Sequence, residues 1–353
     1  MKVLVIGPSP EKSKGGMATV ISEIKSDKDL VTEYNIDIYE SYIDGNIVIR
    51  TIYCIYAYLK FYFTKRDYDI YHIHAASRGS TFRKGYYVRA AKKWGKKVIF
   101  HIHGAQYMEF YRELLKRKKK TVLDILHRAD IVIALSDEWK ERFDSIFKLD
   151  NCVVLENGID TNKYKQAIVD VKSYQHSFLM LGRLGKRKGT YDLIDAIQLA
   201  KKTVPNIKLY LAGDGDIERI KEIIKNKKLE NNIEVVGWVN LNDKLKLLKL
   251  VSTVVLPSYN EGLPMAILEG MVAGKGIIST TVGAIPEVIS DKNGILIKPG
   301  DIKALAQALT TYAQDIDFLC STSAENIIRV NERFSMKAMH NKLADYYNTV
   351  AKM

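Results

Sequence analysis

The chain of 353 residues contains few cysteines and few prolines. Its three cysteines, Cys54, Cys152 and Cys320, stand far apart and form no C-x-x-C pair. This spacing argues against a disulfide framework and against a cysteine zinc site, and it is typical of a reducing compartment. The 7 prolines and the 47% of apolar residues argue against long disordered linkers and favour well-packed globular domains.

Long apolar runs are also missing. No run approaches the ~20 residues that a helix needs to span a bilayer. The opening segment, Met1 to Gly7, is too short for a signal peptide and has no small-residue cleavage site. We therefore expect a soluble, cytoplasmic protein.

Acidic residues are scarce in one segment. Between Arg50 and Arg128 there are 19 Lys and Arg but only 5 Asp and Glu, whereas the net charge of the whole chain is +13. The rest of the chain is therefore about neutral. A basic block on one half predicts an anionic partner, which could be nucleic acid, anionic lipid or a phosphorylated substrate.

Strand and helix patterns alternate along the chain, which predicts α/β domains with parallel sheets. At ~150 residues a domain, the length predicts two of them. Residues 161–177 are polar and lack periodicity, so we expect a linker there, with domains at 1–165 and 173–335. An amphipathic helix is expected from Met336 to Val350. The expected strands are 3–6, 71–74, 98–104, 131–135 and 153–155 in the first domain and 177–181, 208–212, 233–236, 253–256 and 276–279 in the second.

The most informative segment runs from Ser258 to Gly270. It follows an apolar run that is typical of a buried parallel strand. Pro264 suits the first turn of the next helix, and the start of a helix offers unpaired N–H groups and a positive dipole end. Such a position binds phosphate or diphosphate. With Glu261 and Glu269 on either side, the segment suits a ligand rich in hydroxyls, such as a nucleotide sugar.

A second segment, from Gly182 to Gly189, leaves a predicted strand and carries several cations. Arg183 and Lys188 stand beside glycines that expose backbone amides, an arrangement that suits a diphosphate leaving group. The alternative is a solvated basic loop. The Gly213–Asp216 segment lacks the third glycine of a dinucleotide fingerprint.

Together these segments resemble glycosyltransferase family 4, the retaining enzymes that use nucleotide sugars. The resemblance extends over 177–315, the Gly15-Gly16 loop and His103-Gly104. It implies a GT-B fold: two doubly wound, Rossmann-like domains with a cleft between them, and a C-terminal helix, 336–353, that crosses back to the first domain. Its motifs are Gly182-Arg183-Leu184 with Lys188-Gly189, Ala212-Gly213-Asp214-Gly215, Gly237-Trp238-Val239, Pro257-Ser258, Glu261-x7-Glu269, Gly283-Ala284-Ile285-Pro286-Glu287 and Asn293-Gly294.

The resemblance also implies residue roles. Arg183 and Lys188 would hold the donor diphosphate, Glu261 would contact the donor sugar, and Glu269 would bind the ribose. His103 would position the sugar from the first domain, and transfer would need no metal or other cofactor. The implied catalytic residues are Glu261, His103, Arg183 and Lys188. The implied donor-binding residues are Gly16, Arg183, Lys188, Glu261, Gly262, Leu263, Pro264, Met265 and Glu269.

Three histidines, His72, His74 and His101, alternate along the strands that lead to His103, and alternate residues share one face of a strand. No carboxylate or cysteine cluster accompanies them, so we expect structural histidines and no metal site.

The acceptor side is expected in the basic first domain. Residues 50–66 and 107–128 combine apolar residues at helical spacing with Lys and Arg, which is typical of helices at an anionic membrane surface. The alternative for each is an apolar face in the domain core with a solvated basic face. With two such helices we expect a protein peripheral to the inner face of the cell membrane, acting on a lipid-linked acceptor.

The predicted function is therefore a retaining transfer of a hexose-type sugar from a nucleotide sugar, with UDP the expected base. The acceptor would be a lipid-linked or saccharide molecule in surface polysaccharide synthesis. One alternative is a nucleotide-sugar 2-epimerase of the same fold, which would need no acceptor. A nucleic-acid-binding protein is suggested only by the basic block, without RNP-like or helix-turn-helix motifs, so no nucleic-acid partner is expected.

Overall fold

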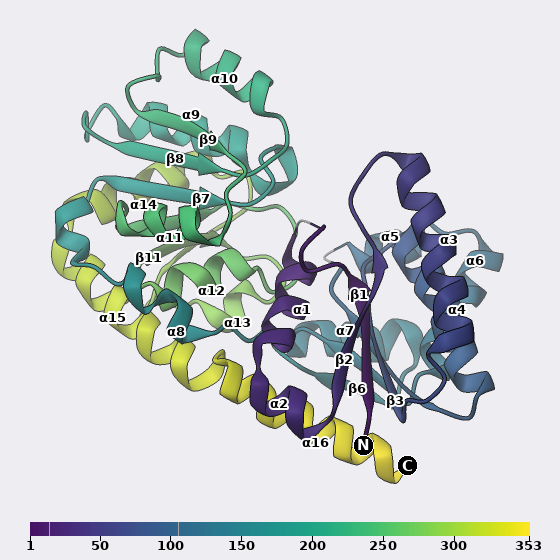
Figure 1. Cartoon of the computed structure of the whole chain (residues 1–353). Helices are drawn as coiled ribbons and strands as arrows, with labels where there is room; N and C mark the ends of the chain where they lie inside the picture. The colour runs from purple at the N-terminus through teal and green to yellow at the C-terminus, as the bar shows by residue number, and fades with distance from the viewer. Residues whose placement is uncertain (14, 105) are drawn as a thin grey trace. The chain divides into compact units, whose positions relative to one another are not determined.

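A computed structural model describes residues 1–13, 15–104 and 106–353 (Figure 1). The chain divides into two compact units. Unit 1 comprises Met1–Gly158 and Met336–Met353, and unit 2 comprises Ile159–Ser335. Each unit is built on its own six-stranded parallel sheet, so each is described separately.

Unit 1 has the strand order β2-β1-β3-β4-β5-β6. The chain order reverses between β1 and β3, as in doubly wound folds. Its strands are β1 (Val3–Pro8), β2 (Ile36–Tyr42), β3 (Ile70–Ala75), β4 (Lys97–Ile102), β5 (Ile131–Ala134) and β6 (Cys152–Val154). Its helices are α1 (Gly16–Ser26), α2 (Lys28–Glu33), α3 (Ile47–Thr64), α4 (Gly79–Lys93), α5 (Tyr107–Glu113), α6 (Lys116–Arg128), α7 (Asp137–Phe147) and α16 (Met336–Lys352).

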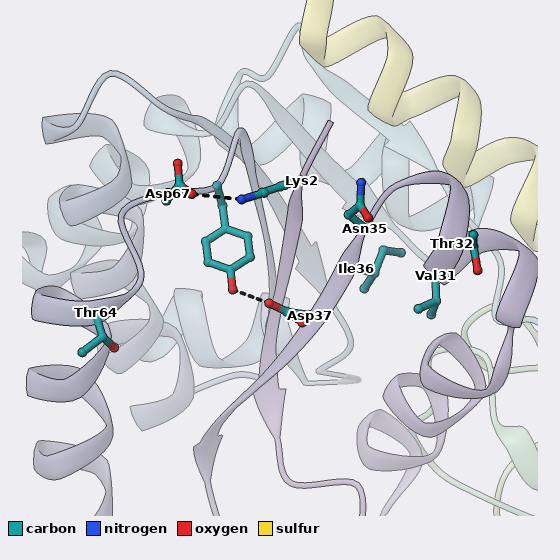
Figure 2. Close-up of a pocket in the computed structure, with 9 residues that line it drawn as sticks. Lys2, Val31, Thr32, Asn35, Ile36, Asp37, Thr64 and Asp67 are labelled. Atoms are coloured by element: carbon teal, nitrogen blue, oxygen red, sulfur yellow. Dashed lines mark hydrogen bonds and ion pairs between the residues drawn. The ribbon is translucent and has the colours of Figure 1, made fainter.

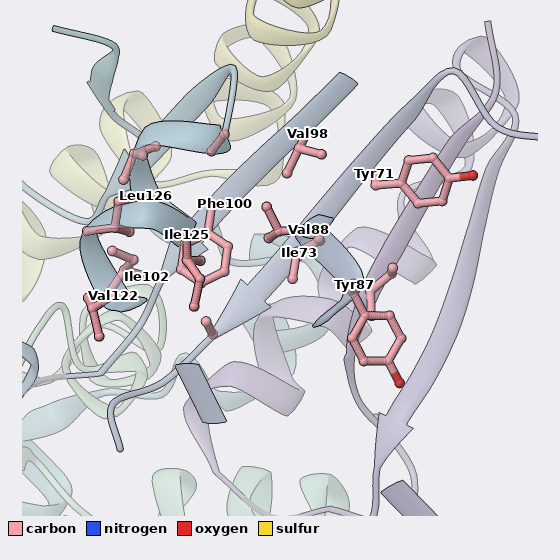
Figure 3. Close-up of a cluster of buried hydrophobic side chains, with 14 of the residues drawn as sticks. Tyr71, Ile73, Tyr87, Val88, Val98, Phe100, Ile102, Val122, Ile125 and Leu126 are labelled. Atoms are coloured by element: carbon pink, nitrogen blue, oxygen red, sulfur yellow. The ribbon is translucent and has the colours of Figure 1, made fainter. Parts of the chain in front are cut away.

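The two faces of this sheet differ in chemistry because successive residues of a strand point to opposite sides. Tyr71 and Ile73 of β3 point into the apolar core formed with α3, α4, α6 and α7, part of which Figure 3 shows. His72 and His74 point to the opposite face, where α1 and α16 pack. There the Tyr347 hydroxyl of α16 lies 2.9 Å from Nδ1 of His72.

The segment 107–128 does not form one continuous helix. It forms two helices, α5 and α6, separated at Leu114 and Leu115. The apolar residues of α6 at helical spacing, Val122, Ile125 and Leu126, are completely buried in the core of unit 1 (Figure 3). The core therefore takes up the apolar face of α6.

The last helix, α16, packs on unit 1. Besides the contact between Tyr347 and His72, the Tyr346 hydroxyl donates to the Val154 carbonyl at 2.7 Å, and the Asn348 amide donates to the Tyr34 hydroxyl at 3.2 Å. Leu343 and Val350 are fully buried. The helix is thus an integral layer of unit 1. Every helix among the described residues is too short or too polar to span a bilayer.

Unit 2 has the strand order β12-β11-β10-β7-β8-β9, and the chain order reverses between β10 and β7. Its strands are β7 (Ser177–Leu181), β8 (Lys208–Ala212), β9 (Ile233–Gly237), β10 (Thr253–Leu256), β11 (Gly276–Thr280) and β12 (Ile295–Ile297). Its α-helices are α8 (Thr161–Tyr164), α9 (Thr190–Ala200), α10 (Ile217–Asn226), α11 (Leu241–Lys249), α12 (Met265–Val272), α13 (Ile285–Val288), α14 (Ile302–Gln314) and α15 (Ile316–Arg333).

The predicted linker over 161–177 is wrong. The segment contains α8 and two short 3₁₀ helices, and Tyr164, Ala167 and Val171 are buried in unit 2. The unit begins at Ile159, whose amide donates to the Phe334 carbonyl at 2.9 Å. Residues 159–165, assigned from sequence to the first domain, therefore lie in unit 2.

Candidate functional site

The site in unit 2 lies at the carboxyl ends of β7 and β10, the adjacent central strands between which the chain order reverses. In open parallel sheets, ligands bind outside the carboxyl ends of the strands at this reversal. The loop from Gly182 to Gly189 follows β7, and the loop from Pro257 to Pro264 follows β10. The two segments singled out from sequence thus meet at the position where the fold favours a ligand.

Glycines let these loops approach closely. A Cβ on Gly189 would lie 2.0 Å from the Pro257 carbonyl oxygen, and the φ of Gly189 is +72°. A Cβ on Gly213 would lie 1.8 Å from the carbonyl oxygen of Gly182. Because a real side chain cannot occupy those positions, glycine is required for the packing of three loops around the end of β7.

Lys188 and Glu261 form the central ion pair of the site. Lys188 Nζ lies 2.6 Å from Glu261 Oε1, and the two side chains are only 13% and 7% exposed. Arg187 supports the same loop, because its guanidinium donates to the Asn260 carbonyl at 3.0 Å. The structure therefore brings together one predicted cation and one predicted carboxylate that are 73 residues apart.

Arg183 is placed differently. Its side chain is exposed at the end of β7, and no described residue forms a hydrogen bond or ion pair with its guanidinium. The adjacent Gly182 lies close to the Lys188 side chain, since a Cβ on Gly182 would be 3.8 Å from Lys188 Nζ. The two predicted cations thus flank one short stretch of backbone, and only Lys188 is paired with an acid.

The helix after the β10 loop is α12. Pro264 precedes its first residue, Met265, with φ −76° and ψ 122°, so it acts as the N-cap and does not occupy the first turn. Gly262, Leu263 and Met265 are buried. The loop is closed by Gly283, where a Cβ would lie 2.0 Å from the Glu261 carbonyl oxygen, and by the Ala284 amide, which donates to the Gly262 carbonyl at 3.1 Å.

Glu269 lies on α12 and has partners that sequence reasoning missed. Its Oε1 accepts from Lys244 Nζ at 2.6 Å and from the Tyr164 hydroxyl at 3.1 Å. Lys244 belongs to α11, and Tyr164 lies in the supposed linker. Nothing in the local sequence of either residue indicates this contact, because it depends on how α8 and α11 pack on unit 2.

The two remaining predicted residues lie in unit 1. Gly16 is the first residue of α1, and no described atom lies within 4 Å of a Cβ built on it. Its neighbour Gly15 has φ +116°, a conformation that favours glycine. His103 follows β4, and its Nε2 lies 2.8 Å from Nδ1 of His74. Burial lowers the pKa of His103 to about 3, so its imidazole is neutral near pH 7.

Three histidines of β3 and β4 form one buried cluster whose ring nitrogens are close enough together to hold a metal ion. His72 Nε2 lies 3.2 Å from Nδ1 of His101, and His72, His74 and His101 each have a ring nitrogen within 4.8 Å of the others. Burial, with the neighbouring rings adding to it, lowers the pKa of all three. His74 connects the cluster to His103 by a hydrogen bond, and the Tyr347 hydroxyl binds His72 on the other side.

A pocket in unit 1 lies where β1 and β2 begin (Figure 2). This is the end of the sheet opposite to His103, which follows the carboxyl end of β4. Its polar groups are largely paired, since Lys2 Nζ lies 3.0 Å from Asp67 and the Tyr68 hydroxyl donates to Asp37. Ligands of parallel sheets bind at the carboxyl ends of strands, whereas this pocket lies at the amino ends. The position of this pocket therefore does not favour it as the ligand site of the sheet.

Two family profiles match adjoining parts of the chain. Residues 19–163 match the profile described as Glycosyltransferase Family 4, and residues 164–326 match the profile described as Glycosyl transferases group 1. The chain therefore belongs to glycosyltransferase family 4, and the membership predicted from its motifs is confirmed.

Several relatives of the chain are named as glycosyltransferases, two of them for the synthesis of a polysaccharide. The protein WcaL of Escherichia coli K12, named as a putative colanic acid biosynthesis glycosyltransferase, is 26% identical over 66% of this chain, and the match spans 60% of WcaL. The amylovoran biosynthesis glycosyltransferase AmsK of Erwinia amylovora is 24% identical over 80% of this chain and 70% of its own length. An Escherichia coli enzyme named UDP-Gal:alpha-D-GlcNAc-diphosphoundecaprenol alpha-1,3-galactosyltransferase is 26% identical over 85% of this chain and 79% of its own length.

Solved structures show the fold. HepE from Anabaena, in complex with UDP, matches 99% of this chain and 100% of its own with a TM-score of 0.78 and 19% identity. Sucrose-phosphate synthase from Thermosynechococcus elongatus matches 99% of this chain and 98% of its own with a TM-score of 0.81 and 17% identity. With two parallel six-stranded sheets, the protein has the two-domain α/β GT-B fold, as predicted.

Proposed function

We propose that the protein transfers a hexose-type sugar from a UDP-sugar to a lipid-linked acceptor in surface polysaccharide synthesis, with retention of the anomeric configuration. The observation that carries this proposal is the buried pair of Lys188 and Glu261 at the carboxyl ends of β7 and β10. The pair places a cation for a diphosphate and a carboxylate for sugar hydroxyls at one point of unit 2. Unit 2 would bind the donor and unit 1 the acceptor.

The chemistry of the leaving group supports these roles. Negative charge develops on the diphosphate oxygen as the glycosidic bond breaks, so positive groups fixed beside it stabilise the transition state more than the ground state. In this proposal Lys188, Arg183 and the start of α12 supply such groups. Glu261 would hold sugar hydroxyls, Glu269 would bind the ribose, and His103 would position the sugar as a neutral hydrogen-bonding group.

The relatives support the donor, the pathway and the kind of acceptor. One is named for UDP-galactose and for a diphosphoundecaprenol acceptor, and two are named for exopolysaccharides. A lipid-linked acceptor would place the enzyme in the cytoplasm at the inner face of the cell membrane. The second candidate acceptor is a saccharide without a lipid.

A nucleotide screen tests the donor site. Binding to the folded state raises its melting temperature, so UDP and one UDP-sugar should raise it more than GDP or ADP. Lys188→Ala should remove that shift, Glu261→Ala should remove the part that the UDP-sugar adds over UDP, and each should reduce transfer by about a hundredfold or more. Lys186→Ala is the matched control, because Lys186 is an exposed lysine of the same loop.

Product analysis tests the reaction itself. Proton NMR of the new linkage gives its anomeric configuration, and an inverted product would contradict retention. If the protein instead interconverted UDP-sugars without an acceptor, the epimerase alternative would replace the transferase. Activity at the wild-type level in both variants would contradict the assignment of the site.

A further inference from the structure

Helix α3 carries an exposed apolar stripe that unit 1 does not cover. Its members lie at i, i+4, i+7, i+8, i+11 and i+15 and are each between 51 and 70% exposed. We name them the α3 stripe: Val48, Ile52, Ile55, Tyr56, Leu59 and Phe63. At about 1.5 Å a residue, the stripe extends for about 22 Å along one side of the helix.

The opposite side of α3 is the side that packs on the domain. Ala57 and Phe61 are buried there, and the Phe61 ring lies 4.7 Å from the Tyr87 ring and 5.3 Å from the Trp94 ring. The helix is thus apolar on two opposite sides, of which the core uses one. Because contiguous exposed apolar surface of this size marks an interaction site, the α3 stripe needs a partner.

Charge around the stripe favours an anionic partner. The sequence from Gly45 to Arg66 contains no Asp or Glu, and neither does α4, the helix beside α3. Lys60 Nζ lies 5.9 Å from the centre of the Tyr56 ring in the stripe, and the exposed Arg66 lies beyond its C-terminal end. A second copy of the chain would bring the same positive charge to a symmetric contact, which is unfavourable.

We propose that the α3 stripe inserts into the headgroup region of an anionic lipid bilayer, with α3 lying in the plane of the membrane. Such helices bury an apolar side at the boundary of the acyl chains while their basic residues attract anionic headgroups. Tyr56 and Phe63 add aromatic rings, which favour the same boundary. Since Phe61 anchors the other side to the core, the helix lies on the membrane and does not cross it.

This proposal deepens the proposed function, on which it rests for the lipid-linked acceptor, and it assigns the membrane contact to α3 alone. The apolar residues of α6 are used by the core, so α6 has no comparable stripe. The lysines of α6 would add only long-range attraction that salt screens.

Vesicle co-sedimentation of the full chain tests the proposal. The wild-type protein should pellet with vesicles of phosphatidylcholine mixed with phosphatidylglycerol and should bind far less to phosphatidylcholine alone. Replacing three stripe residues, in the variant Ile52→Gln, Ile55→Gln, Leu59→Gln, should lower the partition coefficient about tenfold or more. Glutamine keeps helix propensity, and the positions are exposed, so the melting temperature should change little.

The matched control replaces exposed apolar residues of unit 2, in the variant Leu199→Gln, Ile328→Gln, which should bind vesicles like the wild type. Hydrogen exchange of the wild type should show protection of α3 amides by anionic vesicles. Failure of the wild type to bind, equal binding by the triple variant, or a wild-type dimer that the triple variant abolishes would each overturn the proposal. UDP binding, measured in the same proteins, is independent of these results and tests the proposed function separately.

Discussion

Unit 1 should lose stability steeply as the pH falls below neutrality, because three histidines are buried in it as neutral rings. His72, His74 and His101 are at most 1% exposed, and burial lowers the pKa of His72 to about 3 and those of His74 and His101 well below the usual value. No described carboxylate forms an ion pair with any of them. Protonation is therefore unfavourable in the folded state.

The sign and size of the effect follow from linkage. In the unfolded chain each histidine has a pKa of ~6.5, so the unfolded state binds more protons as the pH falls. The contribution of the neutral histidines to the stability of unit 1 is complete above the unfolded pKa of ~6.5. It is lost as the pH falls toward about 3. At about pH 5.5 each of these histidines costs about 1.4 kcal/mol, so the three together cost about 4 kcal/mol, and His103, whose pKa burial also lowers to about 3, adds a similar cost. That is a large part of the ~5–15 kcal/mol that stabilises a typical domain.

Urea unfolding at about pH 7.5 and about pH 5.5 measures this loss, with hydrogen exchange to separate the two units. Unit 2 serves as an internal control, since its only histidine is His176. The variant His101→Asn should lose about 1.4 kcal/mol less than the wild type over the same range. A loss below about 1 kcal/mol in wild-type unit 1 would refute the reasoning, because it would mean that the rings become protonated in the folded state.

Three further predictions concern single contacts. Lys244→Ala leaves the buried Glu269 carboxylate with fewer partners. The variant should destabilise unit 2 by about 1–3 kcal/mol and should bind UDP more weakly in calorimetry. Unchanged stability and affinity would show that the ion pair of Lys244 and Glu269 is dispensable. Tyr347→Phe removes the hydroxyl from His72 and should cost about 1–2 kcal/mol in urea unfolding of unit 1; a neutral result would indicate that water takes its place. Gly189→Ala forces a Cβ against the Pro257 carbonyl. The variant should lower the free energy of unfolding by about 2 kcal/mol or more, which thermal unfolding would measure. Wild-type stability would mean that the loops after β7 and β10 can separate.

Most of the strands could be predicted from sequence, because central parallel strands are buried on both sides and appear as continuous apolar runs. Two strands were missed. β2 has the pattern of a partly exposed strand and includes charged residues, and β12 has only three residues. Both lie at sheet edges, where one side of the strand has no neighbour and the sequence signal is weaker.

The proximity of Lys188 and Glu261 was also predictable, because it follows from the arrangement of parallel strands. Lys188 and Glu261 each follow a central strand, and parallel strands end at the same edge of their sheet, so loop residues that are distant in sequence meet there. Glu269 was predictable as a polar group of α12, but its pairing with Lys244 was not. That contact crosses between helices, and an amphipathic helix pattern does not specify which neighbour its polar side chains meet.

The sequence patterns of α3 and α6, the two basic helices of unit 1, do not show directly which of their apolar residues the domain core covers. Both combine apolar residues with Lys and Arg, and on that basis alone they were treated as equivalent. The buried apolar residues of α6 occupy one arc, at Val122, Ile125 and Leu126. In α3, at 100° a residue, the core residues Ala57 and Phe61 and the exposed stripe lie about 180° apart. A domain covers one side of a surface helix, so a helix with apolar residues on two opposite sides has one side left for another partner, and this difference was already present in the sequence.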